Sequence, residues 1–334
     1  MKKNVLGRTG LEVSVAGFGV LPMGPSQLAL PVEEGAAVIR YALERGINFI
    51  DTAQYYRTYP YIRRALEGGG FDRVVLCSKS LCADYEGMME AVFEAQEALG
   101  REMIDIFLMH EVRSGQLAER TGAWQALVDA RAKGLVRAIG LSTHHVDVAA
   151  AAAEMEELDV VFPLINYAGL GIRKGDAFAT REEMLEAISA CHRAGKGVFS
   201  MKAFGGGSLT AHYQQALNYV FSQPDIDSVM IGFGKTAEVP VTSLDAVCEE
   251  LLDADTPMDY IKYDVEGAET EALLGSRRII ERDAPALLVS AYHRSADLFR
   301  LPILVHELNP AYKLHLRRMA GVPAWDINLY AVKA

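Results

Sequence analysis

The chain has 334 residues, of which 50% are hydrophobic and 23% are charged, and its formal net charge is -11. This composition is typical of a globular protein with a sizeable core. The acidic balance argues against a general binder of nucleic acid or of anionic membrane surfaces. The first residues lead into a turn-rich hairpin, and no apolar run is long enough to cross a bilayer. We therefore expect a cytoplasmic protein whose four scattered cysteines are reduced thiols and not metal ligands.

Short β-branched runs alternate with amphipathic helical segments along residues 1–254. This alternation is the pattern of parallel strands joined by crossover helices. We predict strands at residues 15–20, 48–50, 74–78, 105–109, 138–143, 160–165, 197–202 and 228–232. We predict helices near residues 33–44, 62–66, 88–93, 148–155, 182–193, 212–222 and 243–252. Eight strand–helix units predict a (β/α)8 TIM barrel.

Three of these strands end in polar side chains. Asp51 ends the second strand and Lys79 ends the third. His110 ends the fourth, and Tyr56 lies in the turn after Asp51. Taken singly, each has an ordinary explanation, since a strand-end Asp is often a helix cap and a Tyr near a turn is often packing. Because active sites of barrels lie at the carboxyl ends of the strands, the three ends together predict a catalytic site.

This order of residue types resembles the catalytic tetrad of the aldo/keto reductases. The segments FIDTAQYY, VVLCSKS and DIFLMH are similar to sequences of that family, as is the N-terminal segment LGRTGLEVSVAGFGV. The resemblance implies an oxidoreductase that transfers hydride from NAD(P)H to a small aldehyde or ketone. Tyr56 is then the general acid, with Lys79 stabilising its phenolate. Asp51 would hold Lys79, and His110 would bind the substrate oxygen.

The resemblance also places a cofactor at the ends of several strands. Ser142 and Thr143 take the positions that hold the nicotinamide carboxamide, and Met201 replaces the Tyr that usually stacks on the ring. Lys235 would neutralise a 2′-phosphate, which favours NADPH, with NADH as the alternative. The other cofactor candidates are Gly19, Val20, Asp51, Lys202, Gly205, Gly232 and Gly234. Their glycines are equally explained as plain turns.

The pattern changes after residue 254. The motif IKYDVEGAE begins at Ile261, and it precedes a β run at 286–293 and a hairpin-like pair at 312–316 and 327–331. This segment resembles the C-terminal half of the FkbM-type methyltransferases, a partial Rossmann-like α/β fold. The glycine-rich first half of that fold does not precede it. We therefore predict a barrel at residues 1–254 and a methyltransferase-like fragment at residues 255–334.

More than one function is open at this stage. The first hypothesis is a reductase with a fused, inactive fragment and a small-molecule carbonyl substrate. The second is an S-adenosylmethionine-dependent methyltransferase that another chain completes, and the third is a fusion with neither activity. The strand at 260–265 would have an unpaired edge with apolar side chains on both faces. We expect that edge to dock on the barrel or to pair with a second copy, which would make a homo-oligomer.

Overall fold

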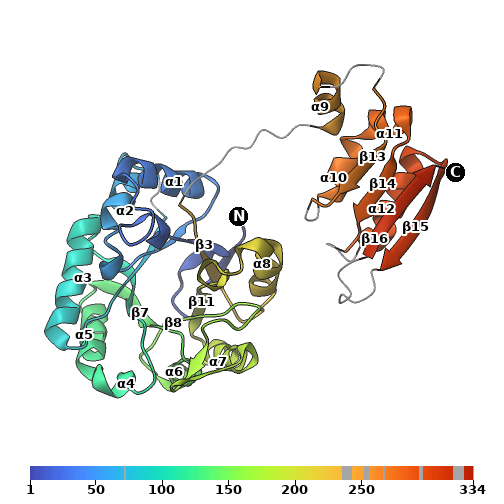
Figure 1. Cartoon of the computed structure of the whole chain (residues 1–334). Coiled ribbons are helices and arrows are strands. Elements are labelled where there is room, and N and C mark those ends of the chain that lie inside the picture. The colour runs from blue at the N-terminus through green and yellow to red at the C-terminus, as the bar shows by residue number, and fades with distance from the viewer. Residues whose placement is uncertain are drawn as a thin grey trace. The chain divides into compact units, whose positions relative to one another are not determined.

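The computed structural model describes residues 1–70, 73–234, 243–251, 256–265, 268–292, 296–318 and 327–333. The chain divides into two compact units, Met1–Ala237 and Glu238–Ala334. Figure 1 colours the first unit from blue to yellow and the second in orange and red.

The first unit contains a closed barrel of parallel strands in the order β11-β12-β3-β4-β5-β6-β7-β8. These strands are β3 (Ala16–Gly19), β4 (Phe49–Asp51), β5 (Val75–Ser80), β6 (Ile104–Met109), β7 (Val136–Thr143), β8 (Val160–Pro163), β11 (Gly197–Ser200) and β12 (Ser228–Gly232). Val229 of β12 pairs with Ala16 of β3, which closes the ring. The predicted eight-stranded parallel barrel is therefore confirmed.

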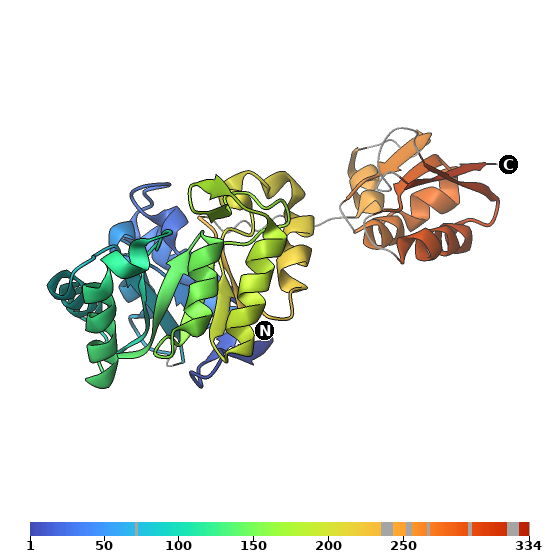
Figure 2. The same cartoon turned by 90° about the horizontal axis from the view of Figure 1, so that it is seen from below.

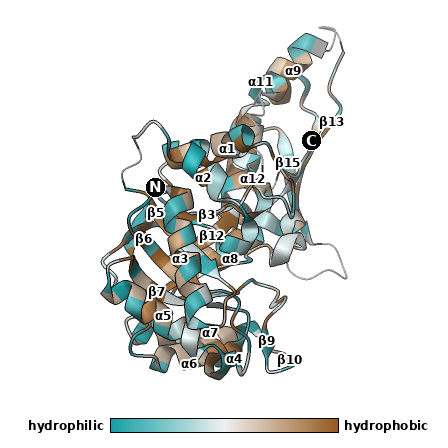
Figure 3. Cartoon of the chain, turned by 90° about the vertical axis from the view of Figure 1, so that its left-hand side faces the viewer, coloured by the Kyte–Doolittle hydropathy of each residue, from teal (hydrophilic) through white to brown (hydrophobic). Residues whose placement is uncertain are grey.

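Helices surround this barrel, as Figure 2 shows. They are α1 (Val32–Glu44), α2 (Tyr59–Leu66), α3 (Tyr85–Leu99), α4 (Gln116–Glu119), α5 (Thr121–Ala132), α6 (Val146–Glu154), α7 (Arg181–Arg193) and α8 (Tyr213–Phe221). Helix α3 begins where the Asp84 side chain accepts from Gly87 N–H, and it ends at Gly100, whose φ is +65°. The barrel strands are mostly brown in Figure 3, whereas the surrounding helices alternate teal and brown because each helix buries only one face.

An N-terminal hairpin closes one end of the barrel. Strands β1 (Lys3–Val5) and β2 (Glu12–Ser14) pair antiparallel. Leu6, Leu11 and Val13 belong to the same buried cluster as the inward side chains of the barrel strands. Two small additions lie in the loop after β8, the strands β9 (Arg173–Lys174) and β10 (Ala177–Phe178).

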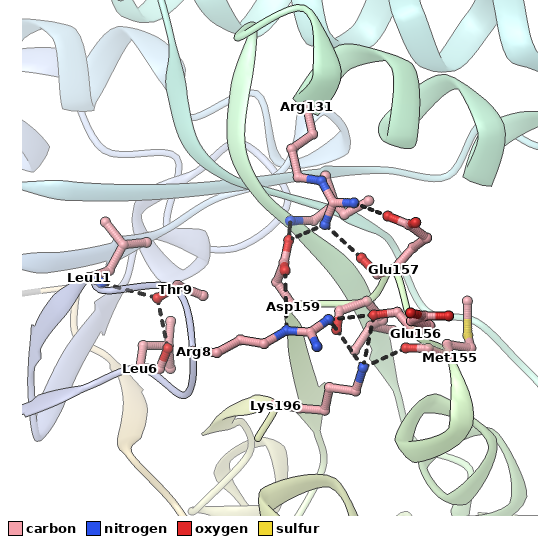
Figure 4. Close-up of polar contacts among 12 residues, drawn as sticks. Leu6, Arg8, Thr9, Leu11, Arg131, Met155, Glu156, Glu157, Asp159 and Lys196 are labelled. Carbon is pink, nitrogen blue, oxygen red and sulfur yellow. Dashed lines mark hydrogen bonds and ion pairs between the residues drawn. The ribbon is translucent and has the colours of Figure 1, made fainter. Parts of the chain in front are cut away.

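A buried cation holds the loop that precedes β8 at this same end. Lys196 is 2% exposed, and its Nζ donates to the carbonyls of Met155 at 2.5 Å, Leu158 at 2.8 Å and Glu156 at 3.3 Å (Figure 4). These carbonyls lie outside any strand or helix, so side chains must supply their donors. The Arg8 guanidinium also donates to the carbonyls of Glu156 and Leu158, so the two cations hold this loop together.

The second unit is built on a four-stranded sheet in the order β13-β14-β16-β15. Its elements are α9 (Leu244–Leu251), β13 (Tyr260–Tyr263), α10 (Glu269–Leu274), α11 (Arg277–Asp283), β14 (Ala286–Ser290), α12 (Asp297–Leu308), β15 (Tyr312–Arg318) and β16 (Ile327–Lys333). Strands β13 and β14 are parallel, whereas β16 is antiparallel to both β14 and β15. The predicted pairing of 312–316 with 327–331 is confirmed.

Helix α9 is part of the second unit, although the sequence assigns it to the barrel as the helix that follows the eighth strand. The Asp245 carboxylate accepts from the N–H groups of Arg278 and Ile279, each at 3.0 Å, so it caps α11. Cys248 lies in the hydrophobic core of the second unit. The compact units divide after Ala237, whereas the sequence predicts a domain boundary after residue 254.

Strand β13 differs from the sequence expectation in its side chains. Ile261 and Tyr263 are buried, whereas Tyr260 is 53% exposed and Lys262 is exposed. Among the described residues β13 pairs only with β14, so it is an edge strand. One of its faces is polar, and not both faces apolar as predicted. A lysine on an edge strand discourages pairing with another strand.

Candidate active site

Polar side chains meet at the carboxyl end of the barrel strands. Asp51 is the last residue of β4, Lys79 is the next-to-last residue of β5, and His110 follows β6. Tyr56 lies in η2 (Gln54–Tyr56), the short 3-10 helix after β4. Because the strands are parallel, their carboxyl ends share one mouth of the barrel. The predicted catalytic residues are thus brought together.

Lys79 and Asp51 form a buried ion pair. Lys79 Nζ lies 2.7 Å from Oδ1 and 2.8 Å from Oδ2 of Asp51, and it donates to the Thr52 carbonyl at 2.7 Å. The two side chains are 1% and 8% exposed. Burial is the largest single influence and lowers the pKa of Lys79, but the charges of Asp51, Tyr56 and Cys77 and the hydrogen bond to Asp51 together raise it. Lys79 is therefore an ammonium at neutral pH.

The Tyr56 phenol lies between this ion pair and His110. Lys79 Nζ is 4.9 Å from the centroid of the Tyr56 ring, and Tyr56 OH is 3.3 Å from His110 Nε2. Burial raises the pKa of Tyr56, and the Lys79 charge opposes that rise. The phenol is therefore protonated at neutral pH, while the cation beside it would stabilise the phenolate once the proton has left.

His110 is neutral. Burial, followed by the charge of Lys79, lowers the pKa of His110 to about 2. Its ring meets the Tyr56 ring edge to face, with centroids 5.4 Å apart and planes at 83°. A neutral imidazole carries one N–H, so it can donate a hydrogen bond to a carbonyl oxygen without adding a charge.

Ser142 and Thr143, the two carboxamide candidates, are both fully buried at the end of β7. Ser142 Oγ accepts from Glu111 N–H at 2.8 Å, which leaves its own proton for another acceptor. Thr143 Oγ1 donates to the Val112 carbonyl at 2.6 Å and accepts from His145 N–H at 2.9 Å. The Thr143 hydroxyl proton is thus used in a hydrogen bond within the protein, whereas the Ser142 hydroxyl proton is available to a ligand.

Met201 and Lys202 follow β11 at the same mouth. Met201 is half-buried and packs against the barrel interior. Lys202 has a φ of +58°, a left-handed conformation that costs a non-glycine residue roughly 1–2 kcal/mol. Burial lowers the pKa of Lys202, and the Glu111 charge opposes this. Glu111 itself forms an ion pair with Arg113 at 2.8 Å.

The remaining cofactor candidates lie at strand ends or in turns. Gly19 ends β3, and the N–H of buried Val20 donates to the Asp51 carbonyl at 3.1 Å. Gly205 begins the 3-10 turn η3 (Gly205–Gly207) and has a φ of +56°. Lys235, the candidate for the 2′-phosphate, lies outside the described residues.

Gly232 and Gly234 have a packing role that the sequence does not reveal. A Cβ on Gly232 would lie 2.6 Å from Cγ of Pro22, and a Cβ on Gly234 would lie 1.9 Å from Cδ1 of Leu28. Both contacts are shorter than any carbon–carbon packing distance. The missing side chains therefore make room for the loop between β3 and α1.

Sequence reasoning missed two groups at this mouth. Arg120, at the junction of α4 and α5, is 5% exposed and donates to the His110 carbonyl at 2.9 Å. His144 follows Thr143, and burial with the Lys202 charge lowers its pKa to about 4. Neither residue ends a predicted strand or stands in a recognisable motif, so no local pattern marks it.

The described part of the chain holds no group of three or more His, Cys, Asp or Glu side chains that could bind a metal ion. The four cysteines are free thiols. No helix in the ranges given above is both long and apolar enough to span a membrane.

The fold and this arrangement of side chains define a barrel oxidoreductase, and comparison with known proteins gives its family. Residues 17–257 match the aldo/keto reductase family, and the chain belongs to that family. It is thus an oxidoreductase that acts on carbonyls, in a family that uses nicotinamide cofactors. The family match extends through α9, although α9 packs in the second unit.

Two curated relatives illustrate the range of the family. The chain is 24% identical over 312 residues to L-galactose dehydrogenase of Arabidopsis thaliana, which covers 80% of this chain and 93% of the relative. It is 28% identical over 180 residues to methylglyoxal reductase DkgA of Escherichia coli, which covers 51% of this chain and 63% of the relative.

Solved structures share the fold. A putative aldo-keto reductase from Pseudomonas aeruginosa superposes with a TM-score of 0.58 at 23% identity, over 70% of this chain and 89% of the other. An aldo-keto reductase from Bacillus halodurans in its holo form superposes with a TM-score of 0.57 at 18% identity, over 70% of this chain and 87% of the other.

Proposed function

We propose that this protein reduces a small aldehyde or ketone with NADPH and that Tyr56 is the general acid. The observation that carries the proposal is the position of Lys79. Its ammonium contacts both Asp51 oxygens and lies 4.9 Å from the Tyr56 ring. A cation beside a neutral phenol favours loss of the phenolic proton as negative charge develops on the substrate oxygen.

The other residues orient the carbonyl. Neutral His110 donates to the substrate oxygen, while Tyr56 OH, 3.3 Å from His110 Nε2, delivers its proton to the same oxygen. Asp51 keeps Lys79 charged and in place. Methylglyoxal with NADPH is the first substrate to test, since one relative is named a methylglyoxal reductase. L-galactose is tested in the reverse direction with NADP⁺, since another relative is named an L-galactose dehydrogenase.

The residues at the strand ends support a nicotinamide dinucleotide, which supplies the hydride when bound. Ser142 retains a hydroxyl proton for the carboxamide oxygen, and Met201 offers an apolar surface to the ring. Lys202 places an amine where a phosphate would be neutralised. Lys235 would favour NADPH over NADH, so Lys235→Ala should narrow the difference between their dissociation constants. Equal constants in the parent protein would disprove that role.

Tyr56→Phe tests the general acid. We expect turnover to fall about 10² to 10⁴-fold, the usual contribution of a general acid. The NADPH dissociation constant should stay unchanged, because only a proton donor is removed. Tyr55→Phe is the matched control, since Tyr55 is 68% exposed and adjacent in sequence. Near-normal turnover in Tyr56→Phe would refute the assignment.

For the second unit we propose an FkbM-like half-fold that lacks activity by itself. Its parallel pair β13–β14 followed by the antiparallel β16 and β15 supports that resemblance. Asp264, after β13, accepts from Ser290 Oγ at 3.0 Å and from Tyr292 OH at 3.3 Å, so polar groups gather where α/β sheets bind ligands. The alternative is a methyltransferase completed by another chain through β13. A rise in Tm with S-adenosylmethionine would favour the alternative, and a rise with NADPH alone would support the reductase.

Two further parts of the proposal concern assembly and place in the cell. We propose that any homo-oligomer forms through the second unit, whose edge strand β13 has one described neighbour. Sedimentation of the full chain and of a chain lacking residues 256–334 tests this, since only the full chain should then associate. The four free thiols favour the cytoplasm.

A further inference from the structure

Arg120 is a buried cation that bonds only to backbone carbonyls in the described structure. It is 5% exposed, and Nη1 donates to the His110 carbonyl at 2.9 Å. Nη2 donates to the carbonyls of Ser80 and Cys82, each at 3.1 Å. Within the described ranges no carboxylate lies at ion-pair distance from its guanidinium. Burial of an unpaired charge is costly, so its retention calls for a reason.

These carbonyls join the two strands that carry catalytic candidates. The β5–β6 ladder ends at the pair Ser80↔Met109. Just beyond it, the Ser80 carbonyl accepts from His110 N–H at 2.9 Å and also from Arg120. The guanidinium thus extends the connection between the strands past the last ladder pair. Its planar fork is what lets one side chain reach both strand ends.

The backbone that Arg120 holds is strained directly after His110. Glu111 has a φ of +49°, a conformation that costs a residue with a Cβ roughly 1–2 kcal/mol. On the far side of this turn Val112 N–H donates to the Ser142 carbonyl at 2.8 Å. On the side of the turn that precedes Glu111, Arg120 holds the backbone by donating to the His110 carbonyl. Strain of this kind persists only where the surroundings over-determine the backbone.

We propose that Arg120 is a positioning residue for the carbonyl reduction, holding the His110 imidazole at its 3.3 Å distance from the Tyr56 hydroxyl. The inference rests on the proposed function and adds a residue to it. The Arg120 charge also contributes to the low pKa of His110, after burial and Lys79. Removing the guanidinium frees the His110 carbonyl, so the ring that orients the substrate moves with it.

Lys196 provides a matched control at the opposite end of the barrel. It too is a buried cation that bonds to three carbonyls, those of Met155, Glu156 and Leu158 (Figure 4). Each of Arg120→Met and Lys196→Met removes three hydrogen bonds from a buried cation to backbone carbonyls. In each set some acceptors keep another donor, His110 N–H for Ser80 and the Arg8 guanidinium for Glu156 and Leu158. Both should therefore lower Tm, and only the first should alter catalysis.

The experiment measures kcat, KM for the carbonyl, the NADPH dissociation constant and Tm. In Arg120→Met we expect kcat to fall about 10 to 100-fold, the scale of a misplacement near 1 Å. The NADPH dissociation constant should change less than about twofold. Arg120→Lys keeps the charge but is too short to reach all three carbonyls, so its kcat should lie between those of the parent protein and of Arg120→Met. Because it should be more stable than Arg120→Met, it also shows whether a loss of kcat comes from misfolding. Unchanged kcat in both variants, or equal losses in Lys196→Met, would overturn the proposal.

A double-mutant cycle decides whether Arg120 acts through His110. In a His110→Ala background, Arg120→Lys should cost less than about twofold, because the ring it positions is gone. The full single-variant loss in that background would overturn the proposal. Tyr56→Phe separates the two levels of inference. Near-normal turnover in Tyr56→Phe refutes the proposed function itself, whereas loss there with normal turnover in the Arg120 variants refutes only the positioning role.

Discussion

The Lys79 ammonium contacts both carboxylate oxygens of Asp51, at 2.7 and 2.8 Å, where both side chains are almost completely buried. Neither charge has water to solvate it, so each depends on the other. Loss of one partner of such a pair typically destabilises a protein by about 3–5 kcal/mol, because the remaining charge stays buried. The pair at the proposed catalytic site therefore also contributes to the stability of the barrel.

Asp51→Asn should be inactive and less stable by a few kcal/mol, on the order of the cost of breaking a buried pair. Denaturant unfolding measures the free energy change. The double variant Asp51→Asn/Lys79→Met removes both charges and is the control, since it should recover most of the stability while remaining inactive. If Asp51→Asn were as stable as the parent protein, the pair would not be buried as described.

The low pKa of His110 predicts a loss of stability in acid. The unfolded chain protonates this His near pH 6.5, whereas the folded protein does not until about pH 2. Stability is therefore complete above the unfolded pKa and falls as the pH drops below it. Between pH 7 and pH 5 this one group should remove about 2 kcal/mol.

His110→Gln tests the same prediction by removing the titrating group. Unfolding free energies at pH 7 and pH 5 are compared for the parent protein and the variant. His144, whose pKa is lowered to about 4, remains in both and cancels in the difference. Equal losses in the two proteins would show that His110 titrates normally in the folded state.

Gly232→Ala should destabilise the barrel because its Cβ would meet Pro22 Cγ at 2.6 Å. Overpacking of this kind costs about 1–3 kcal/mol. Gly19→Ala is the control on the neighbouring strand, where the nearest atoms lie at 3.9 Å. A melting curve for each variant gives the result, and equal Tm values would contradict the packing role of Gly232.

Truncation tests the boundary between the two units. A chain ending at Ala237 retains all eight barrel strands and Lys235, and we expect it to fold and to bind NADPH as the full chain does. A chain ending at residue 254 adds α9 and serves as the comparison. If only the longer chain were soluble or bound NADPH, α9 would complete the barrel, and its place in the second unit would not represent its working position.

Much of the barrel, and the meeting of four polar side chains at its mouth, could be predicted from the sequence. Strand runs such as 74–78 and 106–109 are almost entirely apolar, so their ends can be recognised in the local sequence. A polar residue at such an end, as at Lys79 or His110, must lie at the barrel mouth once the strands are parallel. The order of residues along the chain therefore predicts the fold and the placement of four polar side chains at the barrel mouth.

Only the tertiary structure decided the burial and hydrogen bonds of Arg120, the assignment of α9 and the packing of Gly232. Arg120 lies 40 residues beyond Ser80, and a lone Arg between two helices carries no local signal of burial. Helix α9 has the amphipathic pattern of a barrel helix. It packs in the core of the second unit, where its Asp245 carboxylate caps α11. Hydrophobic periodicity shows which face of a helix or strand is buried, but it does not show which other element covers that face. That choice depends on contacts between segments distant in sequence, which form only when the chain has folded.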